Sequence, residues 1–152
     1  MTLYYEDLNT GDVFDAGEHT FSKEEIIEFA LRFDPQPFHV DEDAAADSLF
    51  GELVASGLHT LCLSSRLAIE EVMLEVDNQA GRGMGNIQWD RPVRPNETIS
   101  VTVEVLEKTP ADSPDYGYVD FELQVDNDDD ERALTFEVYN IVGRRSEERA
   151  SN

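Results

Sequence analysis

The second half of the chain alternates apolar and polar residues with a period of two. From Ile99 to Val105, and again from Val119 to Val125, every second residue is Ile, Val, Phe or Leu. This alternation is typical of strands that bury one face against a core. With a shorter extended segment near the start of the chain and turn residues between the later segments, the pattern predicts five strands, around 13–21, 84–89, 97–108, 116–125 and 132–142.

Between the first and second of these strands the apolar residues follow the period of a helix instead. Ser22, with a glutamate three residues later, forms a capping-box signature that opens an amphipathic helix of about three turns. Pro35 ends this helix, because the residue before a proline is disfavoured in helical conformation. Pro35 and Pro37 are expected to keep the next residues extended, and Asp41 to cap a short helix over residues 42–48.

The longest helical segment is predicted to run from Gly57 to about Val76, and it is apolar on nearly all sides. Cys62 lies within it and is expected to be a small core residue. A helix about 30 Å long with so little polar surface is normally surrounded by other structure. We therefore expect an α+β fold in which an antiparallel sheet of about five strands curls around this helix.

No linker or internal repeat interrupts the pattern, so a single domain is expected over residues 1–152, with its core at about 10–142. The outer face and the edges of such a sheet need cover, which a second copy of the chain would provide. We therefore expect a homodimer or a higher homo-oligomer.

The charge of the chain is strongly negative. There are 34 acidic residues against 11 lysines and arginines, which gives a formal net charge of −23. The acids are interleaved with the apolar residues, which favours a folded protein with an acidic surface over a disordered tail. Such a surface predicts adaptation to concentrated salt, which screens charges within about 3 Å at 1 M; an ordinary acidic protein is the alternative. A nucleic-acid partner is not expected, because phosphate contacts need a basic face.

Features that would direct the chain to a membrane or out of the cell are not found. No segment approaches the roughly 18 uninterrupted apolar residues of a membrane span, and the first residues lack the pattern of a signal peptide. The single cysteine excludes an intrachain disulfide. We expect a cytoplasmic protein with no membrane partner.

The segment Asp34-Pro-Gln-Pro-Phe-His39 places a carboxylate and an imidazole five residues apart, shortly before the helix that Gly57 opens. With ordinary pKa values of about 3.9 and 6.5, these groups supply a base and an acid near neutral pH. Because Asp34 ends a helix, where the dipole disfavours negative charge, it is expected to be a stronger base than an exposed aspartate. The alternative is that Asp34 caps a turn and His39 fills a surface niche.

A metal site is another interpretation of this stretch, with His39, Asp41, Glu42 and Asp43 as its ligands. Metal sites need ligands that converge on one point, and a helix-capping Asp41 followed by solvated acids explains the same residues. No metal site is predicted.

The same stretch resembles a known signature. The residues from Asp34 to Asp41, D-P-Q-P-F-H-V-D, followed by F-G at Phe50 and G-L at Gly57, are similar to the D-x-N-P-x-H-x-D … F … H-G-M pattern of the MaoC-like, (R)-specific enoyl-CoA hydratases. The segment 84–97 also resembles the strand and the F-x-x-P-V-x-x-G-D turn of that family. The resemblance extends over nearly the whole domain and implies the hot-dog fold, a sheet wrapped around a central helix.

The resemblance also implies a reaction. Members of the family add water to a trans-2-enoyl-CoA, or remove it from an (R)-3-hydroxyacyl-CoA, with CoA as part of the substrate and without a metal or redox cofactor. By this resemblance Asp34 is the base for the water and His39 the acid that orients it. The backbone N–H of Gly57 is assigned to the enolate oxygen, a role that suits a glycine at a helix N-terminus.

Further positions are implied for substrate binding. Val54 and Leu58 are expected in the acyl pocket, and Ser65 matches a position where the family often has a hydroxyl near the carboxylate. Gln36 stands where the family has Asn, and Ser56 where it usually has His, so both are expected to alter the pocket. Five arginines are candidates for the CoA phosphates: Arg82, Arg91, Arg94, Arg144 and Arg145.

Two other functions remain open at this point. A hot-dog protein that binds acyl-CoA or a partner without catalysis would not need Asp34 and His39 to share one water. A hot-dog thioesterase would need a carboxylate on or beside the central helix. The first three turns of that helix carry none, so the thioesterase ranks last.

Overall fold

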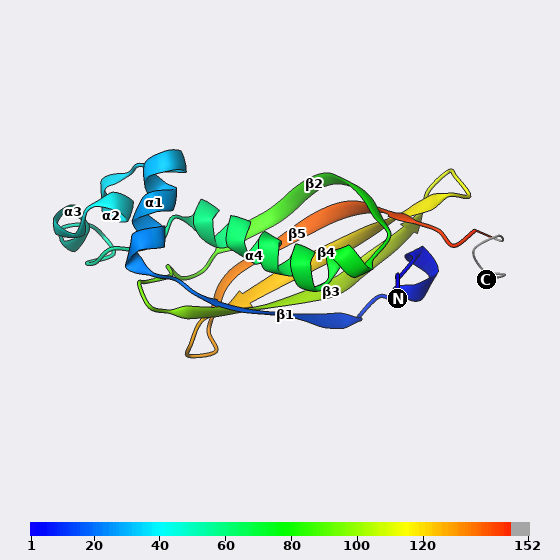
Figure 1. Cartoon of the computed structure of the whole chain (residues 1–152), viewed down its shortest axis with the longest axis horizontal. Coiled ribbons are helices and arrows are strands. Elements are labelled where there is room, and N and C mark those ends of the chain that lie inside the picture. Colours follow the sequence, from blue (N-terminus) through cyan, green and yellow to red (C-terminus); the bar gives the residue numbers. More distant parts are fainter. Residues whose placement is uncertain (147–152) are drawn as a thin grey trace.

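The computed structural model, which describes residues 1–146, has one five-stranded antiparallel sheet. The sheet curves around one long helix, as Figure 1 shows. The order of the strands across the sheet is β1-β3-β4-β5-β2. Their bounds are β1 Val13–Thr20, β2 Asn78–Trp89, β3 Thr98–Pro110, β4 Tyr116–Asp126 and β5 Arg132–Gly143. The expected α+β hot-dog architecture is therefore confirmed, with strand ends close to the predicted ones except at β2, which begins six residues earlier.

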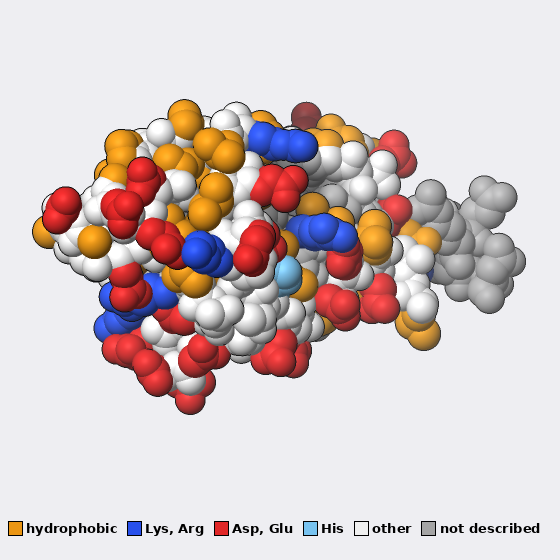
Figure 2. Space-filling model, turned by 60° about the vertical axis from the view of Figure 1, so that its left-hand side comes forward, with side chains coloured by type: hydrophobic (Ala, Val, Ile, Leu, Met, Phe, Trp, Pro, Cys, Tyr) orange, Lys and Arg blue, Asp and Glu red, His pale blue; other side chains and the backbone are white. Residues whose placement is uncertain are grey.

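The core lies between the concave face of the sheet and the long helix. Along β3 and β4 every second side chain is buried, and these are the apolar residues of the two alternating runs. Because strand side chains point alternately to the two faces, this pattern puts the polar residues on the outer face of the sheet. The acidic residues of these strands are among those on the outer face, and Figure 2 shows Asp and Glu side chains spread over the visible surface of the molecule.

The central helix, α4, spans Gly57–Glu71 and ends before the predicted Val76, where a 3₁₀ turn (Met73–Glu75) takes over. Only one side of α4 is covered by the sheet: Thr60, Ser64 and Ala68, four residues apart, are buried. Cys62 is exposed, so its predicted place in the core is wrong. The helical period places Cys62 on the side of α4 that this chain leaves uncovered.

Three shorter helices gather at one end of the sheet (Figure 1). They are α1 Lys23–Phe33, α2 Pro37–Val40 and α3 Glu42–Ala46; a 3₁₀ turn, Tyr5–Asp7, precedes β1. The capping box at Ser22 is confirmed, and Asp41 caps α3 by accepting hydrogen bonds from two backbone N–H groups. The expectation of an extended segment after Pro37 is wrong: this proline starts α2, because it suits the first helical position, where no N–H partner is needed.

One edge of the sheet carries exposed apolar side chains. In β2 no residue is buried, and its exposed side chains include Met84, Ile87 and Trp89. Leu58 and Ile69 on the uncovered side of α4 are exposed as well, and all five residues lie between 40% and 49% exposed. Among residues 1–146, no helix is long and apolar enough to cross a membrane.

Candidate active site

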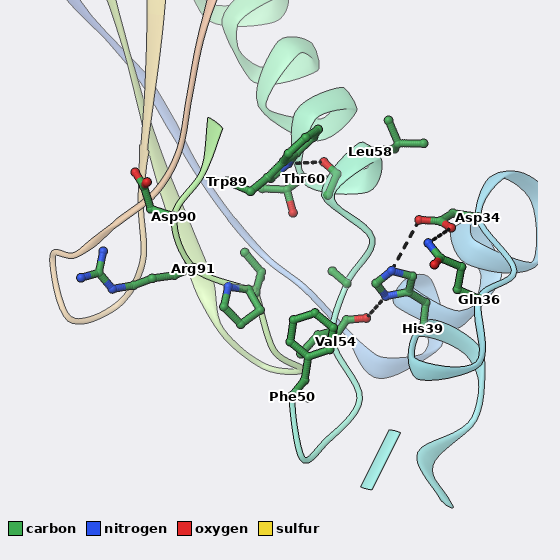
Figure 3. Close-up of a pocket in the computed structure, with 14 residues that line it drawn as sticks. Asp34, Gln36, His39, Phe50, Val54, Leu58, Thr60, Trp89, Asp90 and Arg91 are labelled. Carbon is green, nitrogen blue, oxygen red and sulfur yellow. Dashed lines mark hydrogen bonds and ion pairs between the residues drawn. The ribbon is translucent and has the colours of Figure 1, made fainter. Parts of the chain in front are cut away.

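Asp34 and His39 lie against each other at the junction of α1 and α2. Asp34 is the first residue beyond α1, where its N–H still bonds to the carbonyl of Ala30, and His39 is in α2. Oδ2 of Asp34 is 3.4 Å from Nε2 of His39, and a dashed line in Figure 3 marks this contact. Their side chains are 16% and 7% exposed, so both groups are largely shielded from bulk water.

A hydrogen bond to the backbone of Val54 determines which ring nitrogen of His39 carries a hydrogen. Nδ1 of His39 lies 2.7 Å from the carbonyl oxygen of Val54. A carbonyl oxygen only accepts hydrogen bonds, so Nδ1 carries the hydrogen and donates it. In the neutral ring Nε2 is therefore the acceptor, and it faces a second acceptor in Asp34. A water molecule on the pocket side of the pair, within hydrogen-bond distance of both atoms, can donate one hydrogen to each.

Both carboxylate oxygens of Asp34 receive a hydrogen bond. The hydroxyl of Ser56 donates to Oδ2 over 2.6 Å, and the amide nitrogen of Gln36 donates to Oδ1 over 2.7 Å. Burial alone would raise the pKa of the Asp34 carboxyl, but these two donors and the neighbouring His39 outweigh burial and hold the pKa below its ordinary value. The helix-end argument predicted a stronger base, and that direction is wrong because local donors dominate over the dipole.

Ser56 and Gln36 were expected to shape the pocket, and sequence reasoning missed their contact with Asp34. Ser56 is fully buried and is the N-cap of α4, since its Oγ accepts a hydrogen bond from the N–H of Leu58. Its hydroxyl thus links the start of α4 to the carboxylate at the end of α1. The only available signal was the general preference for serine at the N-cap, which does not point to Asp34.

Gly57 is the first residue of α4 and lines the pocket beside Asp34 and His39. Its N–H belongs to the first turn, whose N–H groups find no carbonyl within the helix and favour negative charge. A Cβ at this position would lie 2.6 Å from two atoms of the Trp89 indole. Glycine is therefore required here by the close approach of Trp89.

These groups open onto a pocket of about 470 Å³ with largely apolar walls. Val54 and Leu58 line it, and so do residues that the sequence did not single out for the site. The complete lining is Asp34, Gln36, His39, Phe50, Val54, Ala55, Gly57, Leu58, Thr60, Trp89, Asp90, Arg91, Pro92 and Val93. Figure 3 shows the walls around the Asp34–His39 pair, with Trp89 against the start of α4.

Ser65 is not part of this pocket. It lies two turns further along α4 and lines a second cavity of about 300 Å³ between α4 and the sheet, with Ile69 and Met84 among the other lining residues. The hydroxyl that contacts Asp34 is that of Ser56 instead. The physical reason is geometric, because only the first turn of α4 reaches the end of α1.

Of the five candidate arginines, Arg91 is the one that lines the pocket. Its Nη1 donates to the carbonyl of Arg132 over 2.6 Å, and its Nε lies 3.2 Å from Glu131. The other four form ion pairs away from the pocket lining: Arg82 with Asp120, Arg94 with Glu52 and Glu97, Arg144 with Glu6, and Arg145 with Asp7.

His59, one turn into α4, packs among aromatic rings and stays outside the site. Its ring stacks on Phe29 with centroids 4.5 Å apart and meets Phe21 edge-on. Burial lowers the pKa of this histidine, which keeps it neutral.

The chain matches a family of known domains. The family model described as "MaoC like domain" matches residues 8–126, so the chain belongs to the MaoC-like domain family. Within it, the chain is 39% identical over 105 residues to the uncharacterized protein YdeM of Bacillus subtilis, covering 69% of this chain and 74% of that protein.

Two further relatives carry more information. A 3-hydroxybutyryl-CoA dehydratase of Methylorubrum extorquens is 31% identical over 109 residues, which cover 71% of this chain and 67% of that protein. A solved structure, the MaoC-like dehydratase from Rhodospirillum rubrum, superimposes with a TM-score of 0.87 at 36% identity, covering 95% of this chain and 99% of that one.

Proposed function

We propose that this protein catalyses the reversible addition of water to a trans-2-enoyl-CoA, which forms an (R)-3-hydroxyacyl-CoA. The observation that carries this proposal is the 3.4 Å separation of Oδ2 of Asp34 and Nε2 of His39 in a largely apolar pocket. The similarity to a 3-hydroxybutyryl-CoA dehydratase supports the same reaction class. A protein that only binds acyl-CoA would have no use for this arrangement.

In the proposed reaction the pair holds the water and Asp34 acts as the base. The oxygen of the water bonds to C3 of the enoyl group while one of its protons passes to Asp34. The electrons of the C2–C3 double bond move toward the thioester carbonyl, and an enolate forms. C2 then takes a proton from the Asp34–His39 pair, whose two groups exchange protons as one unit. No metal or redox cofactor takes part in these steps.

The backbone N–H of Gly57 is the proposed donor to the enolate oxygen. This N–H has no partner within the helix and lies at the positive end of α4. Gly57 lines the same pocket as the acid–base pair. Donors that are already in position at the place where negative charge develops stabilise the transition state more than the ground state. The apolar walls formed by Val54 and Leu58 are the proposed acyl site, and Arg91 is the proposed contact for the CoA phosphates.

We also propose that the protein works as a homodimer. The uncovered side of α4 and the open edge of β2 carry the exposed apolar side chains described above. An edge strand that is apolar and unpaired is a template for association with another chain. A second copy placed against this edge would remove both features from water.

The test compares Asp34→Asn and His39→Ala with the unaltered protein on crotonyl-CoA in molar KCl, following the loss of the enoyl absorbance. Removal of a positioned acid or base is expected to lower turnover by about 10²–10⁴-fold. Matched controls are Asp43→Asn on the exposed face of α3 and His19→Ala on β1, which lie outside the pocket. Unchanged turnover in either site variant contradicts the proposal, and release of free CoA without hydration would indicate a thioesterase instead.

A further inference from the structure

The peptide unit between Gly57 and Leu58 is held at both ends by side chains. Its carbonyl accepts a hydrogen bond from Nε1 of Trp89 over 2.9 Å, which Figure 3 marks with a dashed line. Its N–H donates to Oγ of Ser56 over 3.2 Å. Trp89 is the last residue of β2, so this single peptide connects the end of an edge strand to the start of the central helix.

The chain of hydrogen bonds continues into the acid–base pair. The hydroxyl of Ser56, which accepts from the peptide, donates its own hydrogen to Oδ2 of Asp34 over 2.6 Å. Every bond from Trp89 through the peptide and Ser56 to Asp34 therefore points in the same direction. Hydrogen bonds in such a series polarise one another, so each donor is stronger than it would be alone.

We propose that Trp89 is a positioning residue for the reaction proposed above: its indole N–H, acting through the Gly57–Leu58 peptide and Ser56, fixes Asp34 and the N–H of Gly57 relative to each other. This inference rests on the proposed function. It assigns Trp89 a task beyond lining the pocket, although the indole touches neither Asp34 nor His39.

The shape of the indole supports this role. Its ring atoms lie so close to Gly57 that even a Cβ there would be 2.6 Å away. The start of α4 therefore has no room to move toward β2, and the hydrogen bond to the carbonyl opposes movement away from it. Trp89 thus restrains the Gly57–Leu58 peptide at its carbonyl, while Ser56 restrains the same peptide at its N–H.

The decisive substitution is Trp89→Phe, which keeps an aromatic wall and removes the N–H. We expect kcat to fall about tenfold, the effect of one hydrogen bond of ordinary strength, with KM changed less than about twofold. Without the polarising N–H, Ser56 becomes a weaker donor to Asp34. The acidic limb of the pH profile of kcat/KM is then expected to move to higher pH. The titratable group that faces Asp34 is His39, and the substitution leaves it in place.

Leu58→Ala serves as the comparison, because Leu58 also forms a wall of the pocket but its side chain takes no part in the hydrogen-bond chain. It is expected to raise KM and to leave the acidic limb where it is. If Trp89 were only a wall, Trp89→Phe would keep kcat and the acidic limb and change KM alone, as Leu58→Ala does. That result would overturn the inference.

A second measurement does not depend on turnover. Trp89 is the only tryptophan of the chain, so its fluorescence reports on this contact directly. A pH titration of the fluorescence is expected to contain an acidic transition that disappears in Asp34→Asn and is weakened in Ser56→Ala. Identical titrations in all three proteins would contradict the coupling even if hydration is observed. A coupled titration in a protein that hydrates no enoyl-CoA would instead contradict the proposed function alone.

Discussion

Oγ of Ser56 lies 2.6 Å from Oδ2 of Asp34, although the two residues are 22 positions apart in the sequence. The contact joins the N-cap of α4 to the residue that ends α1. It is the link through which the start of the central helix acts on the proposed base. The same hydroxyl also accepts a hydrogen bond from the N–H of Leu58.

Ser56→Ala is expected to raise the pKa of Asp34 and to move the acidic limb of kcat/KM to higher pH, because one of the donors that lowers this pKa is lost. Loss of the N-cap is expected to reduce the free energy of unfolding by about 1 kcal/mol. Ser64→Ala is the control, since Ser64 is equally buried on α4 and bonds only to the carbonyl of Thr60. It should leave the pH profile unchanged.

The stability of Ser56→Ala also depends on pH. A carboxyl whose pKa is lowered by folding adds stability above its ordinary pKa, and this contribution is lost as the pH falls through the lowered value. Ser56→Ala removes part of that contribution. Chemical denaturation should therefore show the largest difference from the unaltered protein near neutral pH and a smaller one in acid; a difference that grows in acid contradicts this assignment.

Gly57→Ala is expected to destabilise the protein by about 1–3 kcal/mol, because the new methyl group overlaps the indole of Trp89. In a protein that also carries Trp89→Leu, the same substitution should cost much less. The free energies of unfolding of the two single variants and the double variant measure this coupling. If the changes in the free energy of unfolding were strictly additive, the side chain at position 57 would not interact with that of Trp89.

Ile87→Asp is expected to weaken the proposed dimer, because it places a charge among the exposed apolar side chains of the edge strand β2. Light scattering across a dilution series should show a larger fraction of monomer than in the unaltered protein. Leu49→Asp is the control: Leu49 is almost fully exposed, follows α3 and lies outside β2. Equal dissociation in both variants would mean that added charge alone is responsible.

Salt is expected to stabilise the fold. At a net charge of −23, repulsion among the acidic side chains opposes the compact state, and KCl at 1 M screens it within about 3 Å. The midpoint of thermal unfolding should rise between 0.1 M and 2 M KCl by more than it does in sucrose of equal osmolality. A midpoint that does not respond to KCl would contradict the prediction of salt adaptation.

Local patterns were sufficient for much of the fold. The alternation in β3 and β4 and the capping box at Ser22 depend on neighbouring residues, so the sequence predicts them directly. The uncovered side of α4 did not follow from the sequence, because an apolar helix face does not reveal what covers it. The partners of Asp34 were missed for a related reason: only the packing of α1 against the start of α4 brings Ser56 to it, and brings Ser65 elsewhere.

The hydrogen bond from Nδ1 of His39 to the carbonyl of Val54 restricts the route that protons can take. With one nitrogen committed to the backbone, the imidazole gains and loses protons at Nε2 alone, on the side of Asp34 and the pocket. On the side of Val54, the hydrogen bond to the backbone leaves no route for proton exchange. In the proposed reaction, the pair therefore exchanges protons only with what occupies the pocket, so that a proton taken from the water stays available for C2 of the substrate.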